Sequence, residues 1–220
     1  MEEQRMQRVA VFDFDGTIIY GDSVVDMLKK GYREKLVSLP QLLCAAGAGA
    51  LYHIGLISPI TSKRSAHRFL SKLPQEKRDA FLQKFAKSLY DRARPEALQQ
   101  IRKHQENGEH VILCSASGDC YMQYVAPLLQ VNALLCTPCD ENGLPCGTNC
   151  RGEEKVRRVS EYLSEHDLQN ATLTAGYGDT VGDAPILKKC QTPVLVRPRK
   201  KLKKLLPDAA VANWQDIKKS

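Results

Sequence analysis

The feature that most constrains this chain is an apolar run at residues 9–12 that ends directly in two aspartates, Asp13 and Asp15. Gly16 follows them and allows the chain to turn, so that the second carboxylate can be re-aimed. In open α/β sheets, ligands bind beyond the carboxyl ends of the strands. Two acids at such a place could hold Mg²⁺ and attack a phosphorus atom. The alternative is a solvated, aspartate-rich turn.

Short apolar runs alternate with amphipathic stretches along much of the chain, which predicts an α/β fold with a Rossmann-like parallel sheet flanked by helices. From Ser23 to Arg94 only helical periodicity is visible. We therefore predict a core formed by residues 1–22 and 95–220, with residues 23–94 inserted as a helical cap. The strand-like runs are residues 9–12, 111–114, 133–136, 171–175 and 193–196, and the amphipathic stretches are 95–107, 119–130 and 153–165.

Polar residues also follow later strand-like runs. Ser115 ends one of them, and its hydroxyl could bind a phosphate oxygen, or serve only as a helix cap. Asp179 follows the run at residues 171–175 and could complete a site of oxygen ligands, which Mg²⁺ prefers. Asp183, one helical turn further on, could orient such a site from outside. Lys155 opens a predicted helix, where a single lysine is most often solvated.

Taken together and in order, these residues resemble the four motifs of the haloacid dehalogenase-like (HAD) phosphatases. The resemblance covers about residues 9–213 and is to the phosphoserine-phosphatase-like branch, in which a helical cap follows the first motif. The motifs as they stand here are Asp13-Phe14-Asp15-Gly16-Thr17, Ser115, Lys155 and Gly178-Asp179 through Asp183.

The resemblance implies a mechanism for a Mg²⁺-dependent phosphomonoester hydrolase. Asp13 would be the nucleophile that forms an aspartyl-phosphate, and Asp15 would be the general acid and base. The Asp13 carboxylate, the Asp15 backbone carbonyl and Asp179 would hold Mg²⁺, while Ser115 and Lys155 would bind phosphoryl oxygens. A phosphotransferase and a non-catalytic regulatory protein on the same scaffold are the alternatives, although a binding protein would not need both aspartates and the lysine.

Substrate recognition is less defined. Phosphoserine phosphatases have a glutamate seven residues after the acid/base aspartate, and Asp22 stands at that position here. Asp22 is thus a candidate for substrate recognition, with phosphoserine as one alternative substrate. However, the predicted cap contains an uncharged run at residues 36–62 instead of an obvious carboxylate-binding arginine segment. We expect this run to make the substrate entrance apolar, and the substrate to be a small-molecule or lipid head-group phosphate.

The uncharged run has three interpretations: a buried cap helix, which we favour, an interfacial membrane segment, or a true membrane span. Glycines and polar residues interrupt it, and four basic residues precede it as interfacial anchors would. Peripheral membrane contact through the cap therefore stays open. The preceding basic residues are Lys29, Lys30, Arg33 and Lys35.

The cysteines and the net charge restrict the remaining possibilities. No secretory segment opens the sequence, so we expect reduced thiols and a cytoplasmic location, with membrane association open. Cys136, Cys139, Cys146 and Cys150 could surround Zn²⁺ if a hairpin at residues 140–143 paired them, but small buried residues are the favoured interpretation.

A formal charge of +7 suits an anionic partner. A basic cluster near the end of the chain lacks interleaved aromatic residues, so we predict a solvated helix face and no nucleic-acid partner. The cluster consists of Arg197, Arg199, Lys200, Lys201, Lys203 and Lys204.

Overall fold

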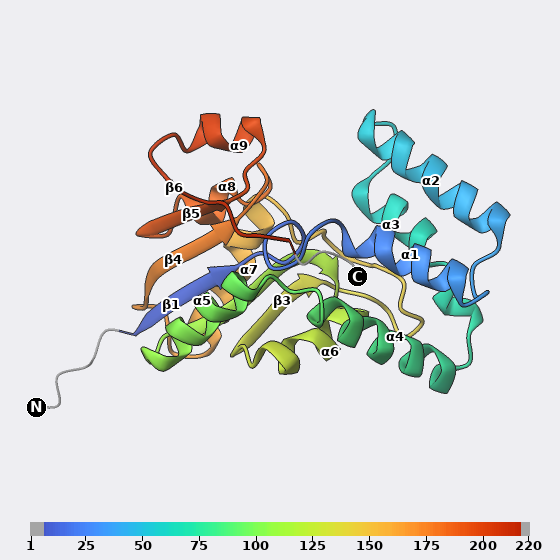
Figure 1. Ribbon diagram of the computed structural model, residues 1–220, viewed down its shortest axis with the longest axis horizontal. Coiled ribbons are helices and arrows are strands. Elements are labelled where there is room, and N and C mark those ends of the chain that lie inside the picture. Colours follow the sequence, from blue (N-terminus) through green and yellow to red (C-terminus); the bar gives the residue numbers. More distant parts are fainter. Residues whose placement is uncertain (1–6, 217–220) are drawn as a thin grey trace, which may run out of the picture.

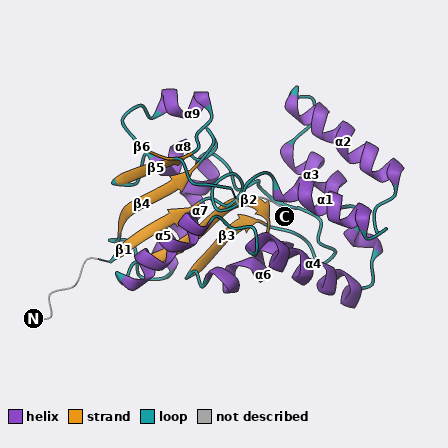
Figure 2. Cartoon of the chain, in the orientation of Figure 1, coloured by secondary structure: helices purple, strands orange, loops and turns teal. Residues whose placement is uncertain are grey.

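The computed structural model describes residues 7–216 and folds them around a six-stranded parallel sheet with the strand order β3-β2-β1-β4-β5-β6 (Figures 1 and 2). The predicted fold class is confirmed, and the five predicted runs form β1 to β5. The ends of the predicted core, residues 1–6 and 217–220, lie outside the described residues. The strands are β1 (Arg8–Phe12), β2 (His110–Gly118), β3 (Ala133–Thr137), β4 (Thr172–Gly178), β5 (Thr192–Val196) and β6 (Ala210–Ala212).

The central strand β1 lies between β2 and β4, with Phe12 opposite Leu113 on one side and Tyr177 on the other. Because the strands are parallel, the residues that follow them meet at one edge of the sheet. β6 escaped prediction because it has only three residues, none of them buried, and therefore shows no apolar run.

Helices cover both faces of the sheet, as the alternation of side chains along β1 requires. Ala10 and Phe12 belong to the buried cluster that includes residues of α5 and α6, whereas Val9 and Val11 belong to the cluster that includes residues of α7. The core helices are α5 (Pro95–Glu106), α6 (Asp119–Leu129), α7 (Glu153–Glu165), α8 (Ala184–Leu187) and α9 (Lys200–Leu205).

Between β1 and α5 the chain is helical, and α1, α2 and α3 lie beyond the carboxyl edge of the sheet (Figure 1). α4 packs on the core helix α6, where the rings of Phe85 and Tyr121 meet edge to face with centroids 5.3 Å apart. The division into core and cap at Ser23 and Arg94 stays our proposal. The inserted elements are α1 (Ser23–Arg33), α2 (Leu39–His53), α3 (Pro59–His67), a 3₁₀ turn (Leu70–Lys72) and α4 (Gln75–Tyr90).

The uncharged run forms α2 and the loops around it, and it is not buried. Ala45 is the one buried residue of α2, while Leu43 and Ile54 are 63% and 70% exposed. The interpretation as a buried cap helix is therefore wrong, because hydropathy does not determine whether a neighbouring element covers an apolar helix. Among the helices of residues 7–216, none combines the length and the apolar composition needed to cross a membrane.

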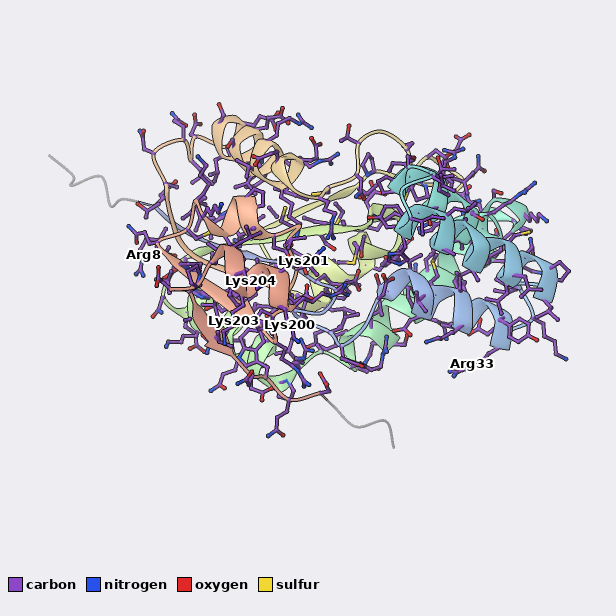
Figure 3. All side chains as sticks on the ribbon, turned by 90° about the horizontal axis from the view of Figure 1, so that it is seen from above. Arg8, Arg33, Lys200, Lys201, Lys203 and Lys204 are labelled. Atoms are coloured by element: carbon purple, nitrogen blue, oxygen red, sulfur yellow. The ribbon has the colours of Figure 1, made fainter. Side chains whose placement is uncertain are left out.

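The basic cluster forms the short helix α9 and the residues before it. Leu202 is fully buried and anchors α9, whereas the four lysines of the helix are exposed and lie together on the surface (Figure 3). A helix that packs through one apolar residue and presents its lysines to solvent agrees with the predicted solvated face.

Candidate active site

Asp13 lies directly after β1 and is buried. Its backbone amide donates to the Tyr177 carbonyl (2.9 Å), which holds it at the edge shared by β1 and β4. Thr17 donates to its Oδ2 at 3.2 Å. Burial, and then the nearby charge of Asp183, raise the pKa of Asp13 to about 6, while Lys155 opposes the shift. The carboxylate is therefore ionised near neutral pH.

Lys155, which the family resemblance singled out although its position at a helix start is typical of a surface lysine, is 1% exposed and joins two carboxylates. Its Nζ donates to Asp13 Oδ1 and to Asp183 Oδ1, both at 2.7 Å. Burial lowers the pKa of Lys155, but Asp13 and Asp183 outweigh burial and hold it well above its usual value. A permanent cation thus lies against the Asp13 carboxylate.

Asp183 is held on both oxygens. Lys155 takes Oδ1, while the backbone amide and the hydroxyl of Thr180 donate to Oδ2 at 2.9 and 3.0 Å. Asp183 therefore orients Lys155. The role predicted for Asp183, orienting the metal site from outside, would come in addition to this contact.

Asp15 lies in a different environment from Asp13. Ser23 donates to it from both its amide (2.8 Å) and its hydroxyl (2.9 Å), and Ser117 donates a further hydrogen bond. Burial, followed by the charge of Asp22, raises the pKa of Asp15 to about 7, although these hydrogen bonds favour the ionised form. Near neutral pH this group can both give and accept a proton. Ser117 thus binds Asp15, and the residue that caps α6, Gly118, offers no side chain.

Asp179 brings a fourth carboxylate to the site, beside Asp13, Asp15 and Asp183. One oxygen each from Asp13, Asp179 and Asp183 lie within 4.8 Å of one another. Asp179 Oδ1 is buried without a hydrogen-bond partner. Burial, then Asp13 and Asp183, raise the pKa of Asp179 to about 8. A buried, unpartnered carboxylate oxygen beside a second acid fits a divalent cation with oxygen ligands, so the residues present are compatible with Mg²⁺.

Gly16 is required at the turn between the two motif aspartates. Its φ is +81°, and a Cβ at this position would lie 2.2 Å from Asp179 Oδ2. Arg94, buried at the start of α5, donates to the Thr17 carbonyl at 2.7 Å and to that of Gly16. The turn is thus fixed from the base of the inserted helices.

Ser115 lies in β2, 1% exposed, where its Oγ accepts from the Ser117 amide at 3.1 Å. Ser115 therefore lies on the strand next to β1, and its role as a phosphate ligand stays a prediction.

Asp22 is exposed and caps α1. Its Oδ1 accepts from the amides of Val24 (2.9 Å) and Val25 (3.1 Å). Helix capping is sufficient to explain an aspartate at position 22. The charge of Asp22 also raises the pKa of Asp15. A role of Asp22 in substrate recognition stays a prediction.

Sequence reasoning missed Lys63, which α3 extends toward the core, where it donates to Asn149 Oδ1 and to the Ala116 carbonyl. Burial lowers its pKa, while the charges of Asp15 and then Asp22 oppose the shift. A signal was available, since Lys63 is the first charged residue after the uncharged run.

A cavity of about 740 Å³ opens between the start of α3 and the loops beyond the sheet. The uncharged run reaches its wall through Ser58, Pro59 and Ile60, whereas no described residue of α2 lines it. The expected apolar entrance stays a prediction, and within the uncharged run it would rest on this short segment and not on α2. Core residues on the wall are Gly147, Thr148, Asn149, Arg151, Gly152, Val181 and Gly182.

The four cysteines that could have formed a zinc site do not come together, which agrees with the favoured interpretation as small buried residues only for Cys136 and Cys150. Cys150 lies 3.8 Å from Cys114 between the sheet and α7, and Cys136 is buried in the other core cluster. Cys139 instead faces His67 and Cys120. The spacing of the cysteines along the chain could not predict this arrangement, because Cys136 and Cys150 pack on opposite faces of the sheet.

Comparison with known proteins agrees with this geometry. The family model for haloacid dehalogenase-like hydrolase matches residues 10–188. Protein CicA of Caulobacter vibrioides is 30% identical over 191 residues, which cover 81% of each chain. Histidinol-phosphatase of Neisseria meningitidis is 24% identical over 219 residues, which cover 90% of this chain and 94% of the relative.

Solved structures share the fold. A Bordetella pertussis protein of unknown function superimposes with a TM-score of 0.85 at 21% identity, over 94% of this chain and 99% of that one. A substrate-bound phosphoserine phosphatase does so with a TM-score of 0.65 at 16% identity, over 94% of each chain. The chain therefore belongs to the haloacid dehalogenase-like hydrolases. Within them it is an enzyme whose fold is shared with the phosphoserine phosphatases.

Proposed function

We propose that this protein is a Mg²⁺-dependent phosphomonoester hydrolase that acts through an aspartyl-phosphate. The observation that carries the proposal is the pair of carboxylates after β1, one buried and one partly buried, in two different environments. Asp13 is ion-paired with Lys155, and Asp15 is held by hydroxyl groups with a pKa raised to about 7. Two acids with different tasks are what a nucleophile and a general acid require. The name of the Neisseria relative, a phosphatase, supports the same chemistry.

In the first step, an Asp13 oxygen forms a bond to phosphorus as the bond from phosphorus to the leaving oxygen breaks. Asp15, protonated, gives its proton to that leaving oxygen. Lys155 lies against Asp13 and would offset charge on the phosphoryl oxygens together with Ser115. A bound Mg²⁺, held by Asp13, Asp179 and the Asp15 carbonyl, would supply further positive charge at these oxygens.

In the second step, Asp15 takes a proton from water, and the water oxygen attacks the phosphorus of the aspartyl-phosphate. The bond between Asp13 and phosphorus breaks, which releases inorganic phosphate and restores the Asp13 carboxylate and the Asp15 acid. A phosphotransferase would differ only in that an alcohol replaces the water.

For the substrate, we propose a small-molecule or lipid head-group phosphate whose leaving group occupies the cavity of about 740 Å³. Its wall combines apolar Pro59, Ile60 and Val181 with the cation Arg151. Hydrolysis of phosphoserine, histidinol phosphate, a sugar phosphate, a nucleotide and a lysophosphatidic acid should be compared by release of inorganic phosphate. Absence of release from every phosphomonoester, with Mg²⁺ present, would contradict the proposal.

Metal dependence is the next expected result. A chelator should abolish phosphate release, and Mg²⁺ should restore it. Asp179→Asn should lose activity at the same Mg²⁺ concentration, because it removes one of the two carboxylates, Asp13 and Asp179, that would hold the ion. Mg²⁺ at about 100 times its dissociation constant should also stabilise the wild type by about 2.7 kcal/mol, measured by thermal unfolding. Asp208→Asn, on the exposed surface, is the control. Full chelator-resistant turnover would indicate another mechanism.

We also propose that the cap contacts an anionic membrane through α2 and the loop that follows it. Leu43, Ile54 and Leu56 are exposed by 63%, 70% and 68%, and no residue between Glu34 and Glu76 is acidic. Apolar side chains flanked by cations suit the interface of an anionic bilayer. The flanking cations are Lys35, Lys63, Arg64, Arg68 and Lys72.

Cosedimentation with vesicles tests this contact. The wild type should pellet with phosphatidylglycerol-containing vesicles more than with neutral ones. Leu43→Asp should weaken that binding about tenfold, since a leucine contributes about 1.5–3 kcal/mol when buried. Leu205→Asp, an exposed leucine on α9, is the matched control. Equal binding to both vesicle types, or an equal loss in Leu205→Asp, would contradict the contact. The contact would also be contradicted if the wild type were a dimer and Leu43→Asp made it a monomer without changing vesicle binding. In that case a second copy of the chain, and not a membrane, would cover α2.

A further inference from the structure

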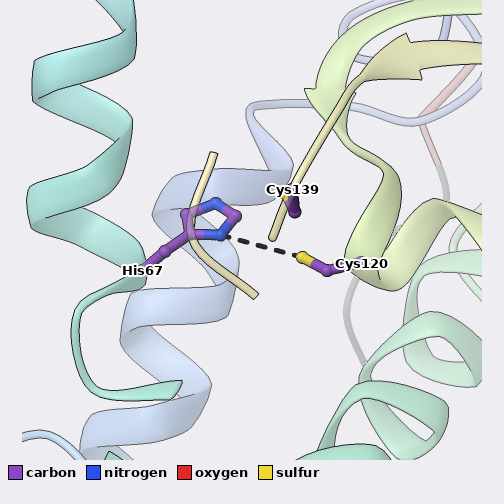
Figure 4. A group of neighbouring side chains, drawn as sticks. All are labelled: His67, Cys120 and Cys139. Atoms are coloured by element: carbon purple, nitrogen blue, oxygen red, sulfur yellow. Dashed lines mark hydrogen bonds between the residues drawn. The ribbon is translucent and has the colours of Figure 1, made fainter. Parts of the chain in front are cut away.

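A second group of ligand-type side chains lies outside the residues assigned to phosphate chemistry. A ring nitrogen of His67 and the sulfurs of Cys120 and Cys139 lie within 4.8 Å of one another (Figure 4). The three come from different parts of the fold. His67 is the last residue of α3, Cys120 is in the first turn of α6, and Cys139 follows β3. The three side chains thus meet where the inserted helices contact the core.

The histidine of this group is fully buried, and one of its nitrogens has no partner. Nδ1 lies 2.9 Å from the Gly143 carbonyl, to which it can donate, and Nε2 is buried without a hydrogen bond. Leaving such an atom unsatisfied costs about 1–3 kcal/mol. Histidines that bind metals commonly donate their second ring N–H to a backbone carbonyl, which fixes the tautomer.

The spacing of the donors suits a small, thiophilic cation. Cys120 Sγ lies 3.8 Å from His67 Nδ1, and one ring nitrogen and both sulfurs lie within 4.8 Å of one another. Because Nδ1 faces the Gly143 carbonyl, the unpartnered Nε2 is the nitrogen left to coordinate. Donor atoms around one tetrahedral Zn²⁺, with bonds of about 2.3 Å to sulfur and 2.0–2.1 Å to nitrogen, lie about 3.6 Å apart. Cys120 and Cys139 are both free thiols, so binding requires the His67 ring and the thiols to close around the ion.

Gly118 makes the close approach of these groups possible. A Cβ on Gly118 would lie 2.9 Å from Cys139 Sγ, closer than real Cβ contacts, and 3.0 Å from His67 Cε1, tighter than most of them. Glycine is the residue that lets the histidine and the cysteine meet over the end of β2.

The open side of the group faces a cavity of about 340 Å³ whose wall includes both cysteines. One basic residue, Arg78, and four acidic residues line this cavity, so its charge favours a cation and leaves a route for the ion to enter. Water or a carboxylate from the wall could take the fourth coordination position. The acidic residues are Asp79, Asp119, Asp140 and Glu141.

We propose that His67, Cys120 and Cys139 bind a thiophilic divalent cation, with Zn²⁺ as the best fit, and that this ion links the inserted helices to the core. Soft thiolate and imidazole donors distinguish this site from the all-oxygen Mg²⁺ site. Because two ligands belong to the core and one ends α3, the bound ion would restrain the helices that cover the active site. This role is structural and independent of the proposed function.

Zinc binding to the reduced, full-length protein tests the proposal. The measurement is competition with a chromophoric chelator, in excess Mg²⁺ to keep zinc from the acidic site. We expect about one zinc per chain. Cys120→Ser and Cys139→Ser should each bind at least about a hundredfold more weakly, since each removes a ligand. Cys146→Ser, which alters a cysteine outside the group, should bind as the wild type does. Bound Co²⁺ should show thiolate charge-transfer absorption that is absent from Cys139→Ser.

Stability gives a second measure that does not depend on turnover. Zinc should raise the melting temperature of the wild type and of Cys146→Ser, but not that of Cys139→Ser. The proposal is overturned if reduced wild type binds no zinc, or if Cys139→Ser binds it as tightly. It is also overturned if Cys146→Ser loses zinc, which would indicate the four-cysteine hairpin. A Cys120–Cys139 disulfide in the purified protein, with no zinc binding after reduction, would identify a redox pair instead.

Discussion

Asp13→Asn is expected to lower kcat by about four orders of magnitude or more while the protein stays folded, because an amide cannot act as the nucleophile. The substitution keeps the size of the side chain and its hydrogen bond from Thr17. Phosphate release, measured with the best substrate of the panel, gives the rate. Far-ultraviolet circular dichroism and the melting temperature report the fold.

The control for this variant is Asp208→Asn, which removes an equal charge from the exposed surface and should keep full activity. Trapping of the aspartyl-phosphate gives a second measure. Brief incubation with a substrate labelled in its phosphate should label the wild type at Asp13 and leave Asp13→Asn unlabelled. Substantial turnover by pure Asp13→Asn would show that another group attacks phosphorus.

Lys155→Met is expected to lower the free energy of unfolding by about 3–5 kcal/mol and to abolish activity. Lys155 is buried and pairs with Asp13 and Asp183 at 2.7 Å each, so its removal leaves two buried carboxylates without a cation. Breaking a buried pair costs this much because the remaining charge stays desolvated. Denaturation with urea, without Mg²⁺, gives the free energy.

A double variant separates this charge effect from lost packing. Lys155→Met/Asp183→Asn removes one of the stranded carboxylates and should regain part of the lost stability, but no activity. Arg157→Met is the matched control on the same helix, because the Arg157 side chain is largely solvated and its surface ion pairs contribute little. If Lys155→Met were as stable as the wild type, the buried pairing would be wrong.

The sequence was sufficient to predict which residues reach the edge of the sheet. Apolar runs of strand length located β1 to β5, and polar residues at or just after these strands identified Asp13, Ser115 and Asp179. The physical reason is that side-chain direction repeats every two residues in a strand and about every four in a helix. Because parallel strands also bring their carboxyl ends to one edge of the sheet, a pattern within a few residues predicts where a side chain emerges.

Contacts between distant residues could not be predicted in this way. Lys155 had only a position at the start of a helix and a family resemblance to support it, whereas its pairing with Asp13 spans 142 positions in the chain. Lys63 and the His67 group depend on where α3 packs against the core. The environments that separate the pKa values of Asp13 and Asp15 likewise depend on neighbours from several elements.

By itself, the sequence determined the fold class, the order of the motifs and the chemical types of the groups at the sheet edge. Only the tertiary structure decided that α2 is exposed, that Asp22 caps α1, and that Cys139 lies beside His67 and Cys120. The reason is that burial and pairing are properties of surfaces brought together from distant positions, and local patterns do not specify which surfaces meet.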